Sequence, residues 1–148
     1  MKSVVTVTVL FLLLVIGWGS PASAEDLGRL SANRFDPESS SNPYGAGSPY
    51  RHDSINNPYG PYGSPFSSRS ANNPYATDAP KLYDSQGNYR GRLSRNPYDP
   101  DSISNPFGRY GSQFSPESIN NPFGAGNPYS VDSPNNPLGE GWRIEGSD

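Results

Sequence analysis

The residue types of a hydrolase triad occur side by side in this sequence, at His52, Asp53 and Ser54. A catalytic triad needs three side chains that converge from separate parts of a rigid scaffold, and adjacent residues do not converge in this way. His52 is the single histidine of the chain, and cysteine is absent. The sequence therefore predicts neither a histidine-dependent catalytic site, nor a disulfide framework, nor a structural zinc site.

Two aspartates with the alternate spacing of a calcium loop occur at Asp99 and Asp101. Such a loop needs glycine at its sixth position and glutamate at its twelfth. Here these positions hold Ser104 and Tyr110. The glycines of the chain lie in turns and not in a phosphate-binding loop after a strand. We therefore expect a protein that is not an enzyme and that uses no metal or cofactor.

Aromatic and arginine side chains are the remaining candidates for binding a partner. From residue 25 onward there are 16 aromatic residues and nine arginines, and 14 acidic residues outnumber 10 basic ones, so nucleic acid is not an expected partner. Aromatic rings stack on arginine, on sugar rings and on apolar surfaces, and many weak contacts on one chain give avidity. The predicted interaction residues are nine aromatics: Tyr44, Tyr59, Tyr75, Tyr83, Tyr89, Tyr98, Phe107, Phe123 and Trp142.

Most of these aromatics recur because the chain contains six copies of an eleven-residue module. The module reads aromatic-x-x-acid-Ser-x-x-Asn-Pro-aromatic-Gly, and Leu138 replaces the second aromatic in the last copy. The copies span residues 35–45, 50–60, 66–76, 98–108, 114–124 and 129–139, and their starts lie 15 or 16 residues apart except for one interval of 32. The module pattern ends in the tetrapeptide Asn-Pro-aromatic-Gly. This tetrapeptide predicts a type I turn with an aromatic residue at its third position.

The long interval contains a segment of different character, residues 81–93. It has no proline, and strand-forming residues flank Gly87 and Asn88. This pattern predicts a short β-hairpin, with residues 142–144 as the candidate third strand. An isolated hairpin is only marginally stable in water.

The apolar content predicts a chain without a hydrophobic core. Leu, Ile, Val and Phe number 15 among residues 25–148, or 12%, which is below the roughly 20% that marks disordered chains. Ordering each residue costs about 1–2 kcal/mol of backbone entropy, and so few apolar side chains do not offset it. We therefore predict a mostly irregular, intrinsically disordered, turn-rich repeat chain. The alternative is a small β-rich array in which the repeats stack as in a solenoid.

Residues 1–24 have the pattern of a secretory signal peptide, with a helical apolar segment. Lys2 precedes an uncharged run, residues 4–18 are mostly apolar, and small residues precede a predicted cleavage site between Ala24 and Glu25. Export to the periplasm or the cell exterior is therefore expected. The alternative is an uncleaved segment that anchors the protein in the membrane.

The expected organisation has six parts: signal peptide 1–24, linker 25–34, first repeat array 35–80, central segment 81–95, second repeat array 96–139 and tail 140–148. The segment 82–88 (LYDSQGN) and the serial Asn-Pro-aromatic-Gly turns resemble short, exported, uncharacterised bacterial proteins with Asn-Pro-Tyr/Phe-Gly repeats. The resemblance covers residues 31–146. It implies export and no activity that transfers to particular residues.

Two functions agree with these expectations. The first is a non-enzymatic, multivalent interaction or structural component of the cell envelope, with an envelope polymer, an exported protein or the protein itself as partner. The second is an accessory protein that folds onto one protein partner through residues 81–93 and 142–144.

Overall fold

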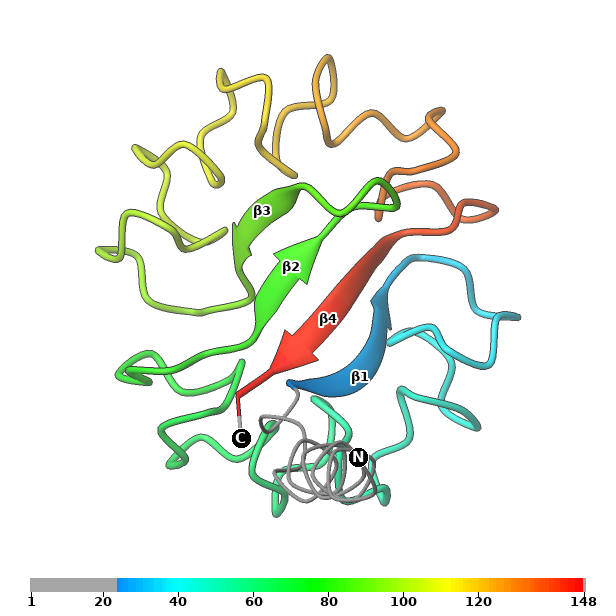
Figure 1. The fold of residues 1–148 in the computed structure, drawn as a ribbon, viewed down its shortest axis with the longest axis vertical. Coiled ribbons are helices and arrows are strands. Elements are labelled where there is room, and N and C mark those ends of the chain that lie inside the picture. The colour runs from blue at the N-terminus through cyan, green and yellow to red at the C-terminus, as the bar shows by residue number, and fades with distance from the viewer. Residues whose placement is uncertain (1–23, 148) are drawn as a thin grey trace, which may run out of the picture.

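Four β-strands form one antiparallel sheet in the computed structural model, which describes residues 24–147. The strands are β1 (Glu25–Leu30), β2 (Lys81–Tyr83), β3 (Tyr89–Arg92) and β4 (Trp142–Gly146). Their order across the sheet is β1-β4-β2-β3, so the last strand along the chain lies inside the sheet, between β1 and β2 (Figure 1). Residues 24–147 contain no helix, and thus none that could cross a membrane. The predicted signal segment, apart from Ala24, lies outside the described residues.

Strands β2 and β3 form the hairpin expected for residues 81–93, and β4 includes residues 142–144. The hairpin turn is held by Asp84, whose Oδ1 accepts the backbone N–H groups of Gln86 and Asn88 at 3.0 and 2.8 Å. Arg90 donates to the other carboxylate oxygen of Asp84 at 3.0 Å. The side chain of Asp84 is only 2% exposed, so this ion pair lies inside the turn.

The turn carboxylate makes stability depend on pH. Burial alone would raise the pKa of Asp84, but the hydrogen bonds from Asn88 and the charge of Arg90 together lower it below its ordinary 3.8. A lowered pKa means a stabilisation that is present above pH 3.8 and is lost as the pH falls through the folded-state value. We expect Asp84→Asn to destabilise the protein by about 1–3 kcal/mol at pH 7, and this difference to shrink below pH 3.8 in thermal melts.

The matched control is Asp53→Asn. Asp53 pairs with Arg51 at the surface, where the side chains are 28% and 50% exposed, and such pairs contribute only about 0–1 kcal/mol. A loss of stability in Asp84→Asn no larger than in Asp53→Asn would contradict the role given to the turn.

The two halves of the chain are related by an approximate two-fold symmetry. The tetrapeptide Gly-Arg-Leu-Ser occurs at residues 28–31 and again at 91–94, in β1 and in the β3 region. Gly28 and Gly91 both have positive φ, +93° and +92°, and both lie in a stretch where the strand register shifts. The centre of the symmetry is the antiparallel pair β2–β4, where Leu82 faces Ile144.

Each outer strand is covered by the repeat array that follows it. Arg29 forms a parallel bridge with Ser39, and Arg92 forms the equivalent bridge with Ser102. The backbone N–H groups of Arg29 and Arg92 donate to the carbonyls of Glu38 and Asp101, both at 2.7 Å. From these bridges the two arrays run around the sheet in the same sense, each covering one side, and together they encircle it (Figure 1). Neither sheet edge is therefore left open for pairing with another chain.

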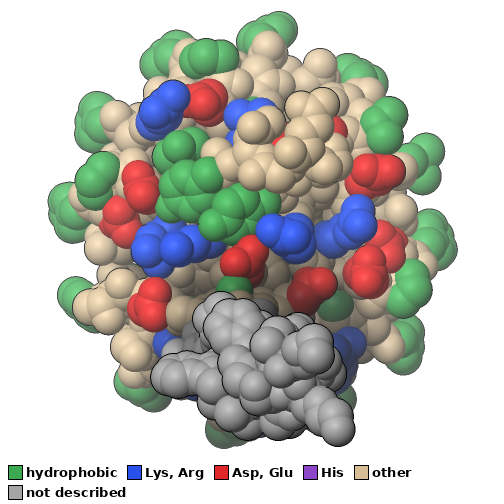
Figure 2. All heavy atoms as spheres, viewed as in Figure 1, with side chains coloured by type: hydrophobic (Ala, Val, Ile, Leu, Met, Phe, Trp, Pro, Cys, Tyr) green, Lys and Arg blue, Asp and Glu red, His purple; other side chains and the backbone are tan. Residues whose placement is uncertain are grey.

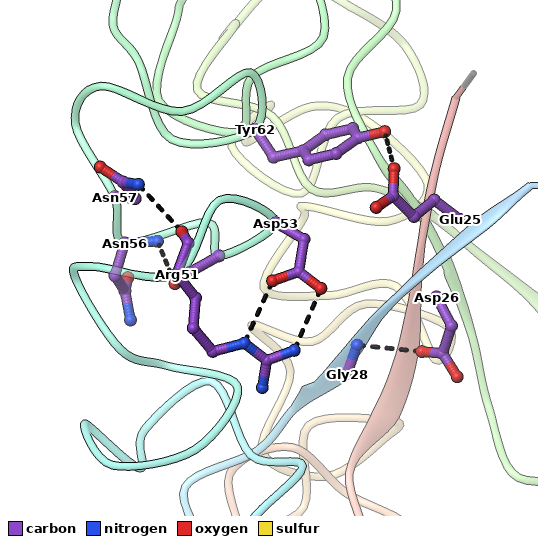
Figure 3. A network of polar contacts seen from close by, with 9 residues as sticks. Glu25, Asp26, Gly28, Arg51, Asp53, Asn56, Asn57 and Tyr62 are labelled. Carbon is purple, nitrogen blue, oxygen red and sulfur yellow. Dashed lines mark hydrogen bonds and ion pairs between the residues drawn. The ribbon is translucent and has the colours of Figure 1, made fainter.

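The hydrophobic core lies between the sheet and the inner residues of the arrays. Leu82 and Ile144 are fully buried and Trp142 is 1% exposed; Leu27, Tyr62, Ala71 and Leu93 complete the cluster. Ile55, Ile103 and Ile119 pack against it from the repeats. The hydroxyl of Tyr62 donates to Glu25 Oε2 at 2.7 Å, which ties the first array to β1 (Figure 3).

The prediction of intrinsic disorder is therefore wrong: the protein is a folded β-sheet protein. The physical reason is that serine and asparagine, which an apolar count ignores, are structural here. The serine of each module is buried to 1% exposure or less, and its hydroxyl accepts the backbone N–H two residues later in Ser39, Ser54, Ser70, Ser102, Ser118 and Ser133. Within residues 24–147 no buried side-chain nitrogen or oxygen lacks a partner. Hydrogen bonding by polar side chains thus supports a core that is small for the chain length.

Candidate interaction surface

The asparagine before each proline fixes the turn that carries an aromatic residue. In the fifth module, Asn121 Oδ1 accepts the backbone N–H of Phe123 at 3.0 Å, and Asn121 Nδ2 donates to the carbonyl of Ser115 at 3.0 Å. The same two bonds recur at Asn42, Asn57, Asn73, Asn105 and Asn136. Figure 3 shows the second of them, from Asn57 to the carbonyl of Arg51. The backbone under each aromatic is therefore ordered before any partner arrives.

In the four modules that follow another module of the same array, a second asparagine joins the module to the preceding part of the array. Asn120 Nδ2 donates to the carbonyls of Ile103 and Gly111, both at 3.0 Å, across 17 and nine residues of sequence. Asn56, Asn72 and Asn135 make the equivalent pair of bonds. Consecutive turns are thus held at fixed separations along each array.

The first and tenth positions of every module project into solvent, and we call these twelve side chains the rim. They are 83–96% exposed: Phe35, Tyr44, Tyr50, Tyr59, Phe66, Tyr75, Tyr98, Phe107, Phe114, Phe123, Tyr129 and Leu138. In the space-filling view, hydrophobic side chains project at intervals around the outline of the molecule, with polar surface between them (Figure 2). Eleven of the twelve are aromatic.

The rim rings are open on both faces. Ring pairs among the described residues involve Tyr83, Tyr89 and Tyr110, and arginine stacks on Tyr62, Trp142, Tyr110 and Tyr83. All of these aromatics lie in the core or on the sheet. No rim ring in residues 24–147 stacks on another ring or on an arginine, so in this part of the chain arginine pairs only with aromatic rings of the core and the sheet.

The structure separates the nine aromatics predicted from the sequence into three groups. Six lie on the rim: Tyr44, Tyr59, Tyr75, Tyr98, Phe107 and Phe123. Tyr83 and Tyr89 are half-buried on the sheet, with ring centroids 5.8 Å apart. Burial and Asp101, which accepts the hydroxyl of Tyr89, raise the pKa of Tyr89 well above its ordinary value. Trp142 is 1% exposed and belongs to the core, so it is not available to a partner.

Sequence reasoning missed five aromatic residues of the rim, all at the first position of a module: Phe35, Tyr50, Phe66, Phe114 and Tyr129. The repeat itself was the available signal, because equivalent positions in equivalent turns are exposed to the same extent. Conversely, Tyr62 and Tyr110 are buried, and both lie outside the modules in a Gly-x-Tyr-Gly sequence.

Residues of the triad-like and calcium-loop-like segments stabilise the fold instead of forming a catalytic or metal site. Ser54 is buried and its hydroxyl accepts the backbone N–H of Asn56. Asp53 pairs with Arg51 (Figure 3), so both residues beside His52 are held in other contacts. Asp101 accepts the hydroxyl of Tyr89. In the described part of the chain, no three His, Asp or Glu side chains come close enough together to hold a metal ion.

The described surface also has a cleft over the sheet and a cleft between the two arrays. One, of about 480 Å³, lies over the sheet beside the hairpin turn and is lined by Arg29 and Arg143 together with Asp84 and Glu140. The other, of about 720 Å³, lies where the end of the first array meets the start of the second. Ala24 and Glu25, on either side of the predicted cleavage site, lie at the start of β1.

Comparisons with protein-family models, with curated proteins and with solved structures found no match to this chain.

Proposed function

We propose that this is an exported, non-enzymatic protein that binds an extended partner through many aromatic contacts, as an interaction or structural component of the cell envelope. The observation that carries the proposal is the rim, whose twelve apolar side chains are all at least 83% exposed. These side chains recur at equivalent positions of fixed turns, so they present many similar apolar contacts to one extended partner. The signal-peptide pattern of residues 1–24 supports export.

The fixed turns make the rim suited to multivalent binding. A ring on a preordered backbone loses little conformational freedom when it docks, so more of the contact energy appears as affinity. Each exposed contact contributes little, but contacts that are linked on one scaffold act at high effective concentration. An extended polymer or a second copy of the protein satisfies this requirement better than a compact small molecule.

The alternative of folding onto one partner through residues 81–93 and 142–144 is less well supported. These segments already pair with each other in β2, β3 and β4, and Leu82, Trp142 and Ile144 are buried together. They therefore serve as anchors within the protein.

Removal of rim aromatics tests the proposal. The variant carries Ser in place of Tyr44, Tyr59, Phe107 and Phe123, and it is compared with the parent for retention on purified cell-envelope material and for self-association. We expect retention to fall by at least about tenfold, with a melting temperature that is nearly unchanged because exposed side chains without contacts contribute within about 0.5 kcal/mol.

The matched control replaces exposed polar residues, with Gln86→Ser and Gln113→Ser. Its retention should equal that of the parent. Equal retention of the four-residue rim variant, or no retention of the parent on envelope material and no self-association, would overturn the proposal.

A further inference from the structure

The junction between the two arrays contains a groove that the repeats alone do not explain. Residues 74–77 form one side of it and residues 96–99 the other, around a volume of about 720 Å³. Tyr75 and Tyr98, which are 86% and 88% exposed, are the two aromatic residues among those that line it. Pro74, Ala76 and Pro97 add apolar surface. The groove thus offers two aromatic rings on a mostly apolar surface.

Three polar groups in the groove have hydrogen-bonding capacity left over. Asn96 accepts the N–H of Tyr98 through Oδ1, but its Nδ2 lacks the carbonyl acceptor that the six module asparagines have. One carboxylate oxygen of Asp99 accepts the N–H of Asp101, and the other has no donor in the described chain. Thr77 makes no hydrogen bond within residues 24–147. A ligand would therefore meet an amide donor, a carboxylate acceptor and a hydroxyl beside the two rings.

The approximate two-fold symmetry gives the molecule a second junction, where the end of the second array meets the start of the first. Residues 33–36 there correspond to residues 96–99 of the groove, and residues 137–140 correspond to residues 74–77. Next to this second junction the backbone N–H of Ala32 donates to the carbonyl of Pro134. Leu138 replaces Tyr75, Phe35 replaces Tyr98 and Arg34 replaces Pro97. Both tyrosines therefore occur at one junction only.

We infer that the groove between Tyr75 and Tyr98 binds a neutral oligosaccharide of equatorially linked pyranose units. Such a sugar has an apolar face of C–H groups for each ring and hydroxyls around its edge that both donate and accept. Those hydroxyls match Asn96, Asp99 and Thr77. Asp99 is the one charged residue lining the groove, so an anionic sugar is disfavoured.

A proline-rich peptide is the competing occupant, since aromatic grooves also bind polyproline helices. Such a helix has no backbone N–H groups at proline and would leave the second carboxylate oxygen of Asp99 without a donor. The sugar uses all three polar groups, and it is therefore the occupant that the groove favours. This inference rests on the proposed function and specifies the chemistry of one site within it.

The test is calorimetric titration of the purified protein with cellohexaose and with hexa-N-acetylchitohexaose, two neutral β-1,4-linked hexasaccharides. We expect saturable binding of at least one of them at micromolar to millimolar concentration. Tyr75→Ser and Tyr98→Ser should each weaken this binding by at least about tenfold. The matched controls are Leu138→Ser and Phe35→Ser at the second junction, which should bind like the parent.

Two outcomes would overturn the inference: binding of neither sugar, whether or not a decaproline peptide binds, or equal sugar binding by Tyr75→Ser and the parent. Melting curves confirm that each variant is folded, which the exposure of these side chains leads us to expect. The four-residue rim variant leaves Tyr75 and Tyr98 intact, so it separates the two proposals. Loss of envelope retention with sugar binding preserved is the result expected if both proposals hold, and unchanged retention with sugar binding preserved contradicts the proposed function alone. Retention of the parent protein without sugar binding contradicts the groove alone.

Discussion

Gly91→Ala should destabilise the protein by about 3–5 kcal/mol, because a side chain at this position is opposed by both the backbone and its neighbours. Gly91 has φ +92°, where a residue with a Cβ is strained. A Cβ there would lie 2.6 Å from the carbonyl oxygen of Asp101 and 2.7 Å from Cβ of Tyr110. That carbonyl accepts the backbone N–H of Arg92, so it cannot move away without breaking the bond between β3 and the second array. Chemical denaturation measures the loss.

Gly87→Ala is the matched control for this substitution. Gly87 has a similar φ of +85°, but a Cβ there would meet nothing within 4 Å. It carries only the conformational strain, which we expect to be about 1 kcal/mol. Equal effects of the two substitutions would mean that the close approach of β3 to the array does not stabilise the fold.

Leu82→Ala should destabilise the protein by about 2–5 kcal/mol. Leu82 is fully buried and faces Ile144 at the centre of the sheet, where both halves of the chain meet. Truncation leaves a cavity that the two central strands cannot close without losing their pairing. The expected result is a cooperative melt in the parent, shifted to lower temperature in the variant.

Leu138→Ala provides the same chemical change on the rim. Leu138 is 83% exposed, so its truncation should change stability by no more than about 0.5 kcal/mol. Similar effects of the two substitutions, or a non-cooperative melt of the parent, would contradict the core described above.

The elements that could be predicted from the sequence are those set by local residue patterns. The hairpin at residues 81–93 follows from strand-forming residues around Gly87, and the turns follow from Asn-Pro at each module. Strand β1 lies within residues 25–34, which are expected to be a linker; no local pattern marks the strand, since Gly28 interrupts it and its partner β4 is more than 100 residues away. The repetition of Gly-Arg-Leu-Ser at 28–31 and 91–94 was the available signal that these segments are equivalent.

The prediction of disorder failed for a different reason. Ser118 and Asn120 are favourable turn residues in any chain, and sequence alone does not show whether their side chains reach a neighbouring module. In the structure Ser118 is fully buried, and Asn120 binds one carbonyl of the preceding module and one of the segment between the two modules. These bonds depend on the separation of the modules, which is a property of the whole array. Counting apolar residues therefore underestimated the stabilisation available to this chain.

The rim was predicted in part for a related reason. An aromatic residue that follows Asn-Pro, such as Tyr44, points outward because the asparagine fixes the turn beneath it. Trp142 follows Gly141 in a strand and points into the core. A list of aromatic residues does not distinguish these two contexts, whereas the module does.

The place of β4 in the sheet also determines when the protein can fold. β4 is the last of the four strands along the chain, yet it separates β1 from the β2–β3 hairpin. Until residues 142–146 have been synthesised, β1 has no partner strand and the hairpin stands alone, which is at most marginally stable. A growing chain therefore cannot complete the sheet before residues 142–146 are available, and β4 joins the two halves of the protein when it pairs with β1 and β2.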